Sequence, residues 1–221
     1  MTNDGWHEVA PADYWEERYA GAERMWSGAV NETMADVVAD LEPGRALDLG
    51  CGEGGDAVWL AEHGWRTTAV DISPTAIERA QAAASELGFT EEQLQFEAAD
   101  LSSWTDETEY DLVTASFLHS PVALSRTDIL RAVAQRVVPG GHLLVIAHAA
   151  RPPWSRHRHG PDDGPTNHDE FPTPEQQIAD LALAPDDWTK VIADVRRRDT
   201  VGPDGQQALL DDTVVLLRRR G

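Results

Sequence analysis

The sequence predicts an α/β fold in which a mostly parallel sheet ends in an antiparallel hairpin and carries helices on both faces. Short apolar runs alternate with amphipathic segments along the 221 residues, which is the pattern of parallel strands joined by helices. The first run, 46–49, leads into a glycine-lined turn at 50–55, as in nucleotide-binding α/β folds. The last two runs, 188–195 and 208–217, flank Gly202-Pro203-Asp204-Gly205, which indicates a closing hairpin.

The elements between these ends follow from hydrophobic periodicity and from capping residues. The predicted strands are Ala46–Leu49, Arg66–Ile72, Leu94–Leu101, Tyr110–Phe117, His142–Ala147, Trp188–Val195 and Ala208–Leu217. The predicted helices span 31–42, 56–63, 74–87, 125–137 and 173–183. Ser73 is expected to cap the third helix, Ser125 with Asp128 approximates a capping box for the fourth, and Pro139-Gly140-Gly141 is expected to turn the chain into the fifth strand.

The turn after the first strand can admit a ligand close to the backbone. Gly50, Gly52 and Gly54 have no Cβ, so the chain can adopt positive φ values there and leave space for a bound group. Asp48 lies inside the end of the strand, where a carboxylate is costly unless a cation or N–H donors meet it. Cys51 is the only cysteine, so no intramolecular disulfide is possible, and its place between two glycines favours a structural role.

Two further acids lie at the ends of the next predicted strands. Asp71 follows the turn by about 20 residues, the spacing at which an acidic side chain accepts ribose hydroxyls. Asp100, near the end of the third strand, can face an adenine amino group. Because the carboxyl ends of parallel strands meet at one edge of a sheet, Asp48, Asp71 and Asp100 together with the glycines predict a site for a nucleoside-type cofactor.

The segment Asp48-Leu49-Gly50-Cys51-Gly52-Glu53-Gly54, with Asp71, Asp100 and Pro139-Gly140-Gly141, resembles class I S-adenosylmethionine-dependent methyltransferases. The resemblance covers nearly the whole chain. It implies a Rossmann-like sheet of seven strands, S-adenosyl-L-methionine as cofactor and S-adenosyl-L-homocysteine as product, with Asp48 meeting the cofactor's ammonium group. The expected cofactor-binding residues at the strand ends are Asp48, Gly50, Cys51, Gly52, Gly54, Asp71, Ile72, Asp100, Leu101 and Ser116.

The N-terminal segment 1–28 is expected to form a helical lid. Its sequences Trp15-Glu16-Glu17-Arg18-Tyr19 and Trp26-Ser27-Gly28 resemble the branch that includes thiopurine and tellurite-resistance methyltransferases. In that branch such a segment folds over the methionine half of the cofactor, which implies that Trp26 lies near the cofactor and Arg18 near its carboxylate. The alternative is that these aromatic residues only pack the lid onto the domain.

The methyl acceptor is expected at the carboxyl ends of the fourth and fifth strands. Phe117, His119, His148 and Arg151 are the predicted substrate-side residues. His119 is the candidate catalytic base, which is required only if the acceptor must lose a proton; the alternative is a packing or hydrogen-bonding role. The polar segment 148–172 is expected to be a long loop beside the site.

The same loop contains histidines and aspartates that could be imagined as metal ligands, namely His157, His159, His168, Asp162, Asp163 and Asp169. No fixed spacing on regular structure holds these side chains together, so no metal site is predicted. Three arginines of the loop, Arg151, Arg156 and Arg158, would instead attract an anionic acceptor.

The charge of the chain favours a small-molecule acceptor. With 39 acidic and 18 basic residues, the formal charge is −21, which repels nucleic-acid phosphates and anionic lipid, although acidity also keeps proteins soluble. The fourth strand lacks the Asn/Asp-Pro-Pro-aromatic sequence of enzymes that methylate amino groups of nucleic acids. A thiol or chalcogen compound is the leading acceptor, with no nucleic-acid or membrane partner; nothing in the sequence sets the oligomeric state.

The chain has no apolar stretch long enough to span a bilayer and no basic start followed by a hydrophobic segment. We therefore expect a cytoplasmic protein with a single domain over residues 1–221.

Two other functions remain open from the sequence alone. Gly50, Gly52 and Gly55 also match the spacing of dinucleotide-binding turns, and Asp71 would serve an NAD-dependent oxidoreductase equally well. Asp48, Asp100 and the closing hairpin argue against that enzyme class. A non-catalytic cofactor-binding protein is the third interpretation.

Overall fold

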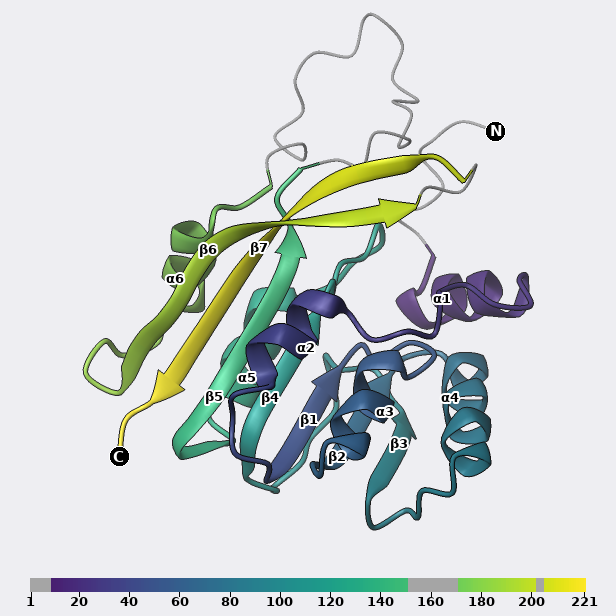
Figure 1. Ribbon diagram of the computed structural model, residues 1–221, viewed down its shortest axis with the longest axis horizontal. Helices are drawn as coiled ribbons and strands as arrows, with labels where there is room; N and C mark the ends of the chain where they lie inside the picture. The colour runs from purple at the N-terminus through teal and green to yellow at the C-terminus, as the bar shows by residue number, and fades with distance from the viewer. Residues whose placement is uncertain (1–8, 151–170, 202–204) are drawn as a thin grey trace, which may run out of the picture.

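The computed structural model describes residues 9–150, 171–201 and 205–221. Within them, seven strands form one sheet in the order β3-β2-β1-β4-β5-β7-β6 (Figure 1). The strands are β1 (Arg45–Leu49), β2 (Arg66–Asp71), β3 (Leu94–Ala98), β4 (Tyr110–Ser116), β5 (Val137–His148), β6 (Trp188–Val201) and β7 (Gln207–Arg219). The helices are α1 (Pro11–Ala20), α2 (Glu32–Val38), α3 (Gly55–Glu62), α4 (Pro74–Glu86), α5 (Arg126–Ala134) and α6 (Pro174–Leu181).

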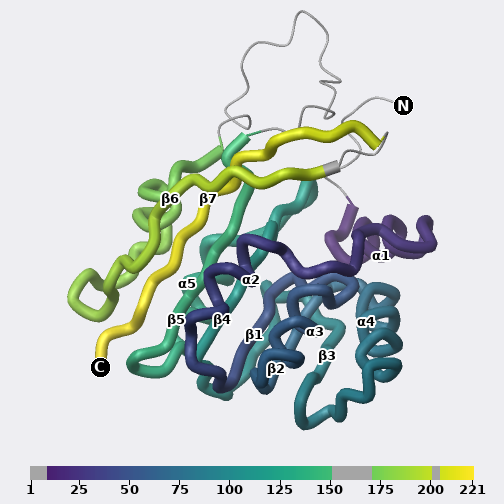
Figure 2. The backbone as a smooth tube through the Cα atoms, viewed as in Figure 1, coloured from purple at the N-terminus to yellow at the C-terminus, as the bar shows by residue number. Residues whose placement is uncertain are grey.

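The sheet is parallel from β3 to β5 and antiparallel at β7 and β6. The strand order reverses between β1 and β4, the position at which open α/β sheets bind ligands, and we call the region beyond the carboxyl ends of β1, β2, β4 and β5 the crevice. The tube in Figure 2 shows α1 lying beyond the carboxyl ends of β1 and β2, next to α4. The predicted Rossmann-like fold, with its parallel sheet and C-terminal hairpin, is confirmed.

Helices cover both faces of the parallel part of the sheet. Side chains of β1 alternate between the two cores: Ala46 packs with Met34 of α2, whereas Leu47 packs with Leu130 of α5. Helices α2, α3 and α4 lie on the first face, and α5 and α6 on the second. A central strand covered on both sides is apolar along its length, which makes the buried carboxyl group of Asp48 exceptional in β1.

Side chains cap α2 and α4, and the cap at Ser73 forms as predicted. The side chain of Asn31 accepts hydrogen bonds from the first turn of α2, and Ser73 accepts one from the Ala76 N–H of α4. The capping box predicted at Ser125 is wrong. The backbone of Ser125 has φ −76° and ψ 53°, outside the extended region of an ordinary N-cap, and its hydroxyl caps nothing. Asp128 pairs with Arg131 at 2.9 Å instead.

Three strand boundaries differ from the predicted ones. Strand β3 ends at Ala98, because the Asp100 carboxylate accepts a bond from the Ser102 N–H at 2.8 Å and turns the chain. Pro139-Gly140-Gly141 lies within β5 as a bulge, with Gly140 at φ 88°. The hairpin is longer than predicted, reaching Val201 in β6 and starting at Gln207 in β7.

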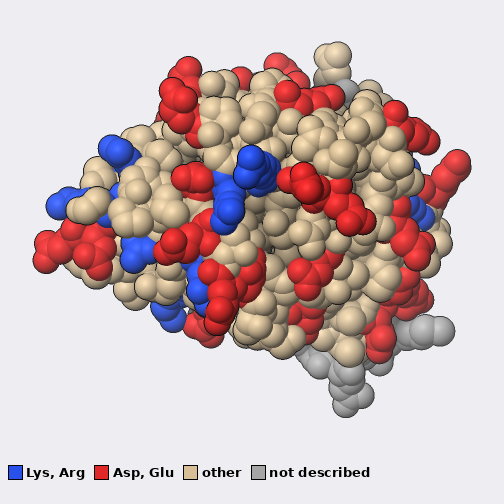
Figure 3. Space-filling model, turned by 90° about the horizontal axis from the view of Figure 1, so that it is seen from below, with Lys and Arg blue, Asp and Glu red and all other residues tan. Residues whose placement is uncertain are grey.

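The surface is as acidic as the composition indicates. Figure 3 shows acidic side chains spread over one face of the molecule and more numerous there than basic ones. In the part of the chain that the structure describes, no helix is long and apolar enough to cross a membrane.

Candidate functional site

The glycine turn connects β1 to α3 at the centre of the crevice. Gly50 and Gly52 have φ values of 69° and 53°, which an L side chain rarely adopts. A Cβ on Gly52 would lie 2.9 Å from the Tyr19 hydroxyl and 3.4 Å from the Trp26 ring, so the N-terminal segment passes directly over the turn. Gly54 differs: a Cβ there would meet Ala80 at 2.9 Å, which places this glycine at the contact between α3 and α4.

Three carboxyl groups surround the turn. Asp48 is 2% exposed, accepts a hydrogen bond from the Thr114 hydroxyl at 3.0 Å, and has a second oxygen with no partner among the described residues. Asp56, in the first turn of α3, accepts the Asn31 N–H at 2.7 Å. No lysine or arginine in the described ranges forms an ion pair with Asp48, Asp56 or Asp71.

The pKa values of all three carboxyl groups are raised, and the charges of two of them act on the third, Asp48. Burial, followed by the charges of Asp56 and Asp71, raises the pKa of Asp48 well above its usual range. Burial also raises the pKa values of Asp56 and Asp71, although N–H donors oppose it in both cases. A bound cation would relieve this repulsion, and that electrostatic need is the clearest sign of a ligand at the turn.

Asp71 is fixed at the end of β2 as predicted. Its carboxylate accepts the N–H groups of Gly52 at 2.9 Å and Ser73 at 3.0 Å, and the Ile72 N–H also lowers its pKa. These bonds hold the carboxylate beside the glycine turn, and a carboxylate retains further lone pairs for a ligand.

The other predicted cofactor residues lie along the same edge. Asp100 is exposed in the turn after β3, and Leu101 packs against the core. Ser116 ends β4, and its buried hydroxyl has no hydrogen-bond partner among the described residues. Cys51 is partly buried, and burial with the charges of Asp71 and Asp48 raises the pKa of its thiol well above the usual range. A thiol kept protonated is a poor nucleophile, which fits the structural role expected for it.

Helix α1 forms a roof over the crevice. On one side, Glu16 accepts a hydrogen bond from the Ser73 hydroxyl at 2.6 Å and also binds Thr75 at the start of α4. On the other side, the Trp15 indole N–H donates to the Ser120 hydroxyl at 3.1 Å in the loop after β4. The helix therefore bridges two sides of the crevice; residues 1–8 of the predicted lid segment lie outside the described residues.

A buried ion pair fastens the end of the lid. Glu53 accepts the N–H groups of Met25 and Trp26 and pairs with Arg79 at 2.8 Å. Arg79 also donates to the carbonyls of Tyr19 and, at 2.6 Å, Ala22. Trp26 is 53% exposed and donates its indole N–H to the Tyr19 hydroxyl, so it lies beside the turn with one face open.

Arg18 lies on the exposed side of α1. Its side chain is exposed, donates to the Tyr14 hydroxyl at 3.3 Å and lies over the Trp15 ring. These contacts are all within α1.

The predicted substrate-side residues come together at the ends of β4 and β5. Phe117 has φ 54°, an uncommon value for an aromatic residue, and its ring stacks on His148 with centroids 4.4 Å apart. The ring of His119 lies 6.1 Å from that of His148. Arg151 and the six histidines and aspartates weighed as metal ligands lie outside the described residues.

His148 is also held from the side. Its Nδ1 lies 3.1 Å from Oδ1 of Asp212, whose side chain is fully buried. Nε of Arg198 lies 2.5 Å from the other carboxylate oxygen, and the guanidinium is 5.3 Å from the Phe117 ring centroid. Aromatic stacking and ion pairing thus fix one imidazole in orientation.

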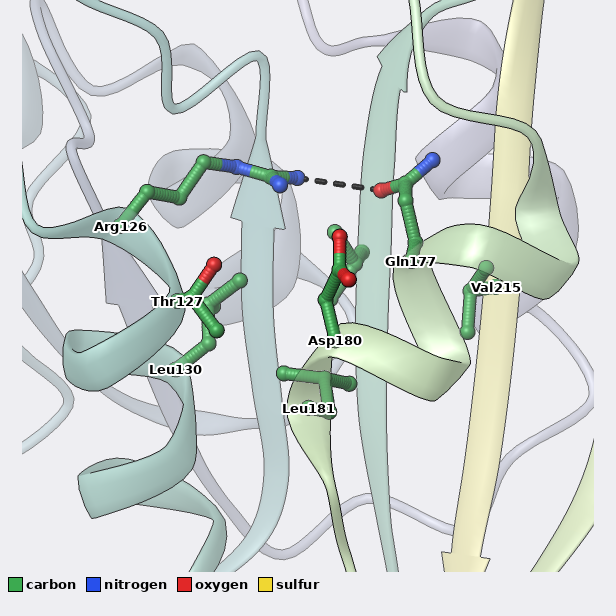
Figure 4. A pocket seen from close by; sticks show the side chains of 8 residues that line it. Arg126, Thr127, Leu130, Gln177, Asp180, Leu181 and Val215 are labelled. Carbon is green, nitrogen blue, oxygen red and sulfur yellow. Dashed lines mark hydrogen bonds between the residues drawn. The ribbon is translucent and has the colours of Figure 1, made fainter.

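The environment of His119 disfavours a positive charge on its ring. Burial, followed by the charges of Arg126 and His148, lowers its pKa to about 4. Figure 4 shows Arg126 reaching from α5 toward α6, where it donates to Gln177 at 3.1 Å. Among the described residues, Arg126 has no carboxylate within ion-pair distance, although the charge of Asp180 acts on its guanidinium from farther away.

Several residues of the site escaped the sequence reasoning, and these are Glu16, Glu53, Arg79, Arg198 and Asp212. Two of them carried a signal that could have been used. Glu53 is an acid inside a glycine turn, and Asp212 interrupts the apolar run of the last strand; both positions are costly for a charge unless it has a partner.

Many known proteins with similar sequences are methyltransferases. Residues 46–141 match the family described as Methyltransferase domain. The 2-heptyl-1-hydroxyquinolin-4(1H)-one methyltransferase of Mycobacteroides abscessus is 30% identical over 64% of this chain and 67% of its own length. Ribosomal RNA small subunit methyltransferase C of Alcanivorax borkumensis is 30% identical over 57% of this chain but only 40% of its own length, so the chain spans well under two thirds of that relative.

Solved structures share the fold over nearly the whole chain. One, from work on the conversion of a disulfide bond into a thioacetal group during echinomycin biosynthesis, has a TM-score of 0.70 at 24% identity and covers 95% of this chain and 93% of its own. TehB from Haemophilus influenzae has a TM-score of 0.65 at 16% identity and covers 93% of this chain and 67% of its own. At these identities the likeness concerns the fold alone.

Proposed function

The chain belongs to the class I S-adenosylmethionine-dependent methyltransferases, and on that premise we propose that it methylates a small molecule at a sulfur or chalcogen atom. S-adenosylmethionine is its cofactor. We also propose which residues bind the cofactor and which bind the acceptor.

The uncompensated carboxyl cluster is the observation that carries the proposed cofactor site. S-adenosylmethionine brings an ammonium and a sulfonium charge to a place where burial and the charges of Asp56 and Asp71 raise the pKa of Asp48. In this proposal the orphan oxygen of Asp48 receives the ammonium group, and Asp71 accepts the ribose hydroxyls. Asp100 lies farther along the same edge, on the adenine side.

The chain needs few catalytic groups for this reaction. When bound, the cofactor supplies a methyl carbon already activated by its sulfonium sulfur. The protein has to align the acceptor and exclude water. Helix α1 covers the crevice through Trp15 and Glu16, and the stacked rings of Phe117 and His148 offer a flat surface for the acceptor.

Three features support a small sulfur or chalcogen acceptor. The formal charge of −21 opposes the approach of nucleic acid. The sequence leaving β4, Phe117-Leu118-His119, lacks the motif of nucleic-acid amino methylation. The lid resembles that of the thiopurine and tellurite branch. A heteroaromatic hydroxyl is the second candidate, because the relative from M. abscessus is named for a hydroxyquinolone.

The acceptor class can be tested by measuring S-adenosylhomocysteine release with a panel of thiols, selenite, tellurite, thiopurines, hydroxyquinolones and short RNA. We expect turnover with the sulfur or chalcogen compounds. Turnover confined to hydroxyquinolones would establish the second candidate, and turnover with RNA alone would contradict the proposal.

The ribose assignment is tested separately by Asp71→Ala. Loss of its hydrogen bonds should weaken S-adenosylmethionine binding roughly tenfold or more by calorimetry. Asp36→Ala, at an exposed position of α2, is the matched control and should bind normally. Equal affinity in the two variants would contradict the role given to Asp71.

A further inference from the structure

We infer that His148, held in place by Asp212, is the base that removes the proton from the methyl acceptor, and that His119 is not this base. The inference rests on the proposed function, because a base is needed only when the reacting sulfur or oxygen atom carries a proton. His148 would be the catalytic residue, and Asp212 would be a positioning residue that acts through it.

The register of the sheet brings the two residues together. His148 ends β5 and is paired with Asp212 of the antiparallel strand β7. Nδ1 of His148 lies 3.1 Å from Oδ1 of Asp212. Because an ionised carboxylate only accepts hydrogen bonds, Nδ1 must carry the hydrogen in the neutral ring, and Nε2 is then the nitrogen that can take up a proton. The side chain of His148 is 28% exposed, so an acceptor can reach it.

Two partners fix the orientation of the His148 ring. The buried carboxylate of Asp212 lies beside the ring, and it is itself held by Nε of Arg198 at 2.5 Å. Arg198 also lies over Phe117, the ring that stacks on His148. The imidazole is therefore fixed at its edge and on its face, which is what proton transfer in a defined geometry requires.

The surroundings of His119 disfavour protonation of its ring. Its Nε2 is buried without a hydrogen-bond partner among the described residues. Burial, followed by the charges of Arg126 and His148, lowers the pKa of His119 to about 4. A neutral imidazole of this kind can contact the acceptor, but it takes up a proton poorly near pH 7.

The proton and the electrons balance without a further reactant. The acceptor's S–H or O–H bond breaks and its proton goes to Nε2 of His148, giving an imidazolium beside Asp212. The electron pair left on the acceptor forms the new bond to the methyl carbon, while the old carbon–sulfur bond breaks and its pair returns to the sulfonium sulfur. The imidazolium then releases its proton to water.

Two acceptors of one type distinguish this role from a structural one. The first is a thiol that is protonated at pH 7, and the second is an acidic thiophenol that is already a thiolate there. His148→Gln should slow methylation of the first by about 10²–10⁴-fold and of the second by no more than a few-fold. His63→Gln is the matched control, since His63 is exposed and stacks on Trp59 at the end of α3.

Asp212→Asn tests the positioning role by two readouts. In the pH–rate profile for the protonated thiol, the acid limb should move in Asp212→Asn and vanish in His148→Gln, whereas His119→Gln should retain it. In ¹⁵N spectra of histidine-labelled protein without ligands, His148 should show the Nδ1–H tautomer in the wild type and lose that preference in Asp212→Asn. The second readout does not depend on activity.

The outcomes separate the two proposals. If the wild-type protein methylates neither thiol, the proposed sulfur acceptor is wrong and the base inference fails with it. If it methylates both and His148→Gln slows them equally, or if the acid limb follows His119→Gln, the proposed function stands and the base assignment is overturned. Absence of the Nδ1–H tautomer in the wild type would overturn the positioning role of Asp212.

Discussion

Asp48 and Asp212 are both buried in the sheet, with 2% and 0% of the residue exposed, yet their surroundings are opposite. Asp212 lies between the imidazole of His148 and the guanidinium of Arg198. Asp48 has a hydroxyl partner, Thr114, and neighbouring carboxyl groups that raise its pKa. The charge of Asp212 is compensated within the folded protein, whereas the carboxyl group of Asp48 needs a bound cation for compensation.

This contrast separates the crevice into two functional halves. On the side of β1 and β2, the protein stores electrostatic repulsion that a cationic ligand relieves. On the side of β5 and β7, the charges are already satisfied and serve to orient one side chain. The two halves should therefore respond in opposite directions when an acid is removed.

The largest effect is expected for Asp212→Ala. Removing the carboxylate leaves Arg198 and His148 facing each other without compensation, and breaking a buried pair of this kind costs about 3–5 kcal/mol. Urea unfolding should show the loss. Asp211→Ala is the control, because Asp211 pairs with Arg197 on the exposed face of the same hairpin and should hardly change stability. An equal loss of stability in Asp212→Ala and Asp211→Ala would mean that the buried ion pairs of Asp212 add no more stability than the exposed pair of Asp211.

Asp48→Asn should separate stability from ligand binding. The amide keeps an oxygen for the Thr114 hydroxyl but removes a repelled charge, so Tm of the cofactor-free protein should rise by roughly 2–4 °C, the shift that 1 kcal/mol produces at this size. Affinity for S-adenosylmethionine should fall roughly tenfold or more, because the ammonium loses its carboxylate. Scanning calorimetry and titration calorimetry measure the two effects. A variant that is less stable and binds normally would refute the interpretation of Asp48 as a charge awaiting a ligand.

A smaller, local effect is expected for Glu53→Gln. Burial alone would raise the pKa of Glu53, but the Trp26 and Met25 N–H groups and Arg79 keep it below the ordinary value. Losing that charge should weaken the attachment of the lid by about 1–2 kcal/mol, which hydrogen exchange would detect as faster exchange at Met25 and Trp26. Glu78→Gln, an exposed neighbour of Arg79 on α4, should leave these amides unchanged. Equal protection in both variants would show that the ion pair does not fasten the lid.

The smallest effect is a pH dependence of the acidic cluster. The pKa values of Asp48, Asp56 and Asp71 are raised by folding, so the folded protein holds more protons than the unfolded chain above about pH 4, and its stability without cofactor should fall as pH rises through the raised values. Cofactor affinity should rise over the same interval, because the ionised carboxyls attract the cation. Both slopes should be shallower in Asp48→Asn; unchanged slopes would assign the dependence to other groups.

The fold and the cofactor edge could be predicted because their signals are local. Alternating apolar segments define the strands, and a glycine turn between an acid and a helix defines the crevice. Asp71 and Asp100 could be assigned to the same edge because the carboxyl ends of parallel strands meet there. The prediction placed Asp100 inside a strand, whereas its own side chain ends the strand by bonding to Ser102.

The remaining contacts depend on pairings that no local pattern contains. Glu53 and Arg79 meet because α4 packs beside the turn. Asp212 meets His148 through the register of two antiparallel strands, and the bulge at Gly140 shifts the register of β5 against β4. A one-residue slip would turn Asp212 to the other face of the sheet, so this pairing could be learned only from the folded chain.

The roof formed by α1 has a consequence for turnover. Glu16 and Trp15 attach the helix to opposite sides of the crevice, so at the proposed site release of the spent cofactor would require these contacts to open. Hydrogen bonds from Ser73 and Thr75 hold the pKa of Glu16 below its usual value. The contacts of the Glu16 carboxylate with these two residues therefore persist throughout the neutral pH range. Product residence time, set by the opening of one helix, should then limit the rate once methyl transfer is fast.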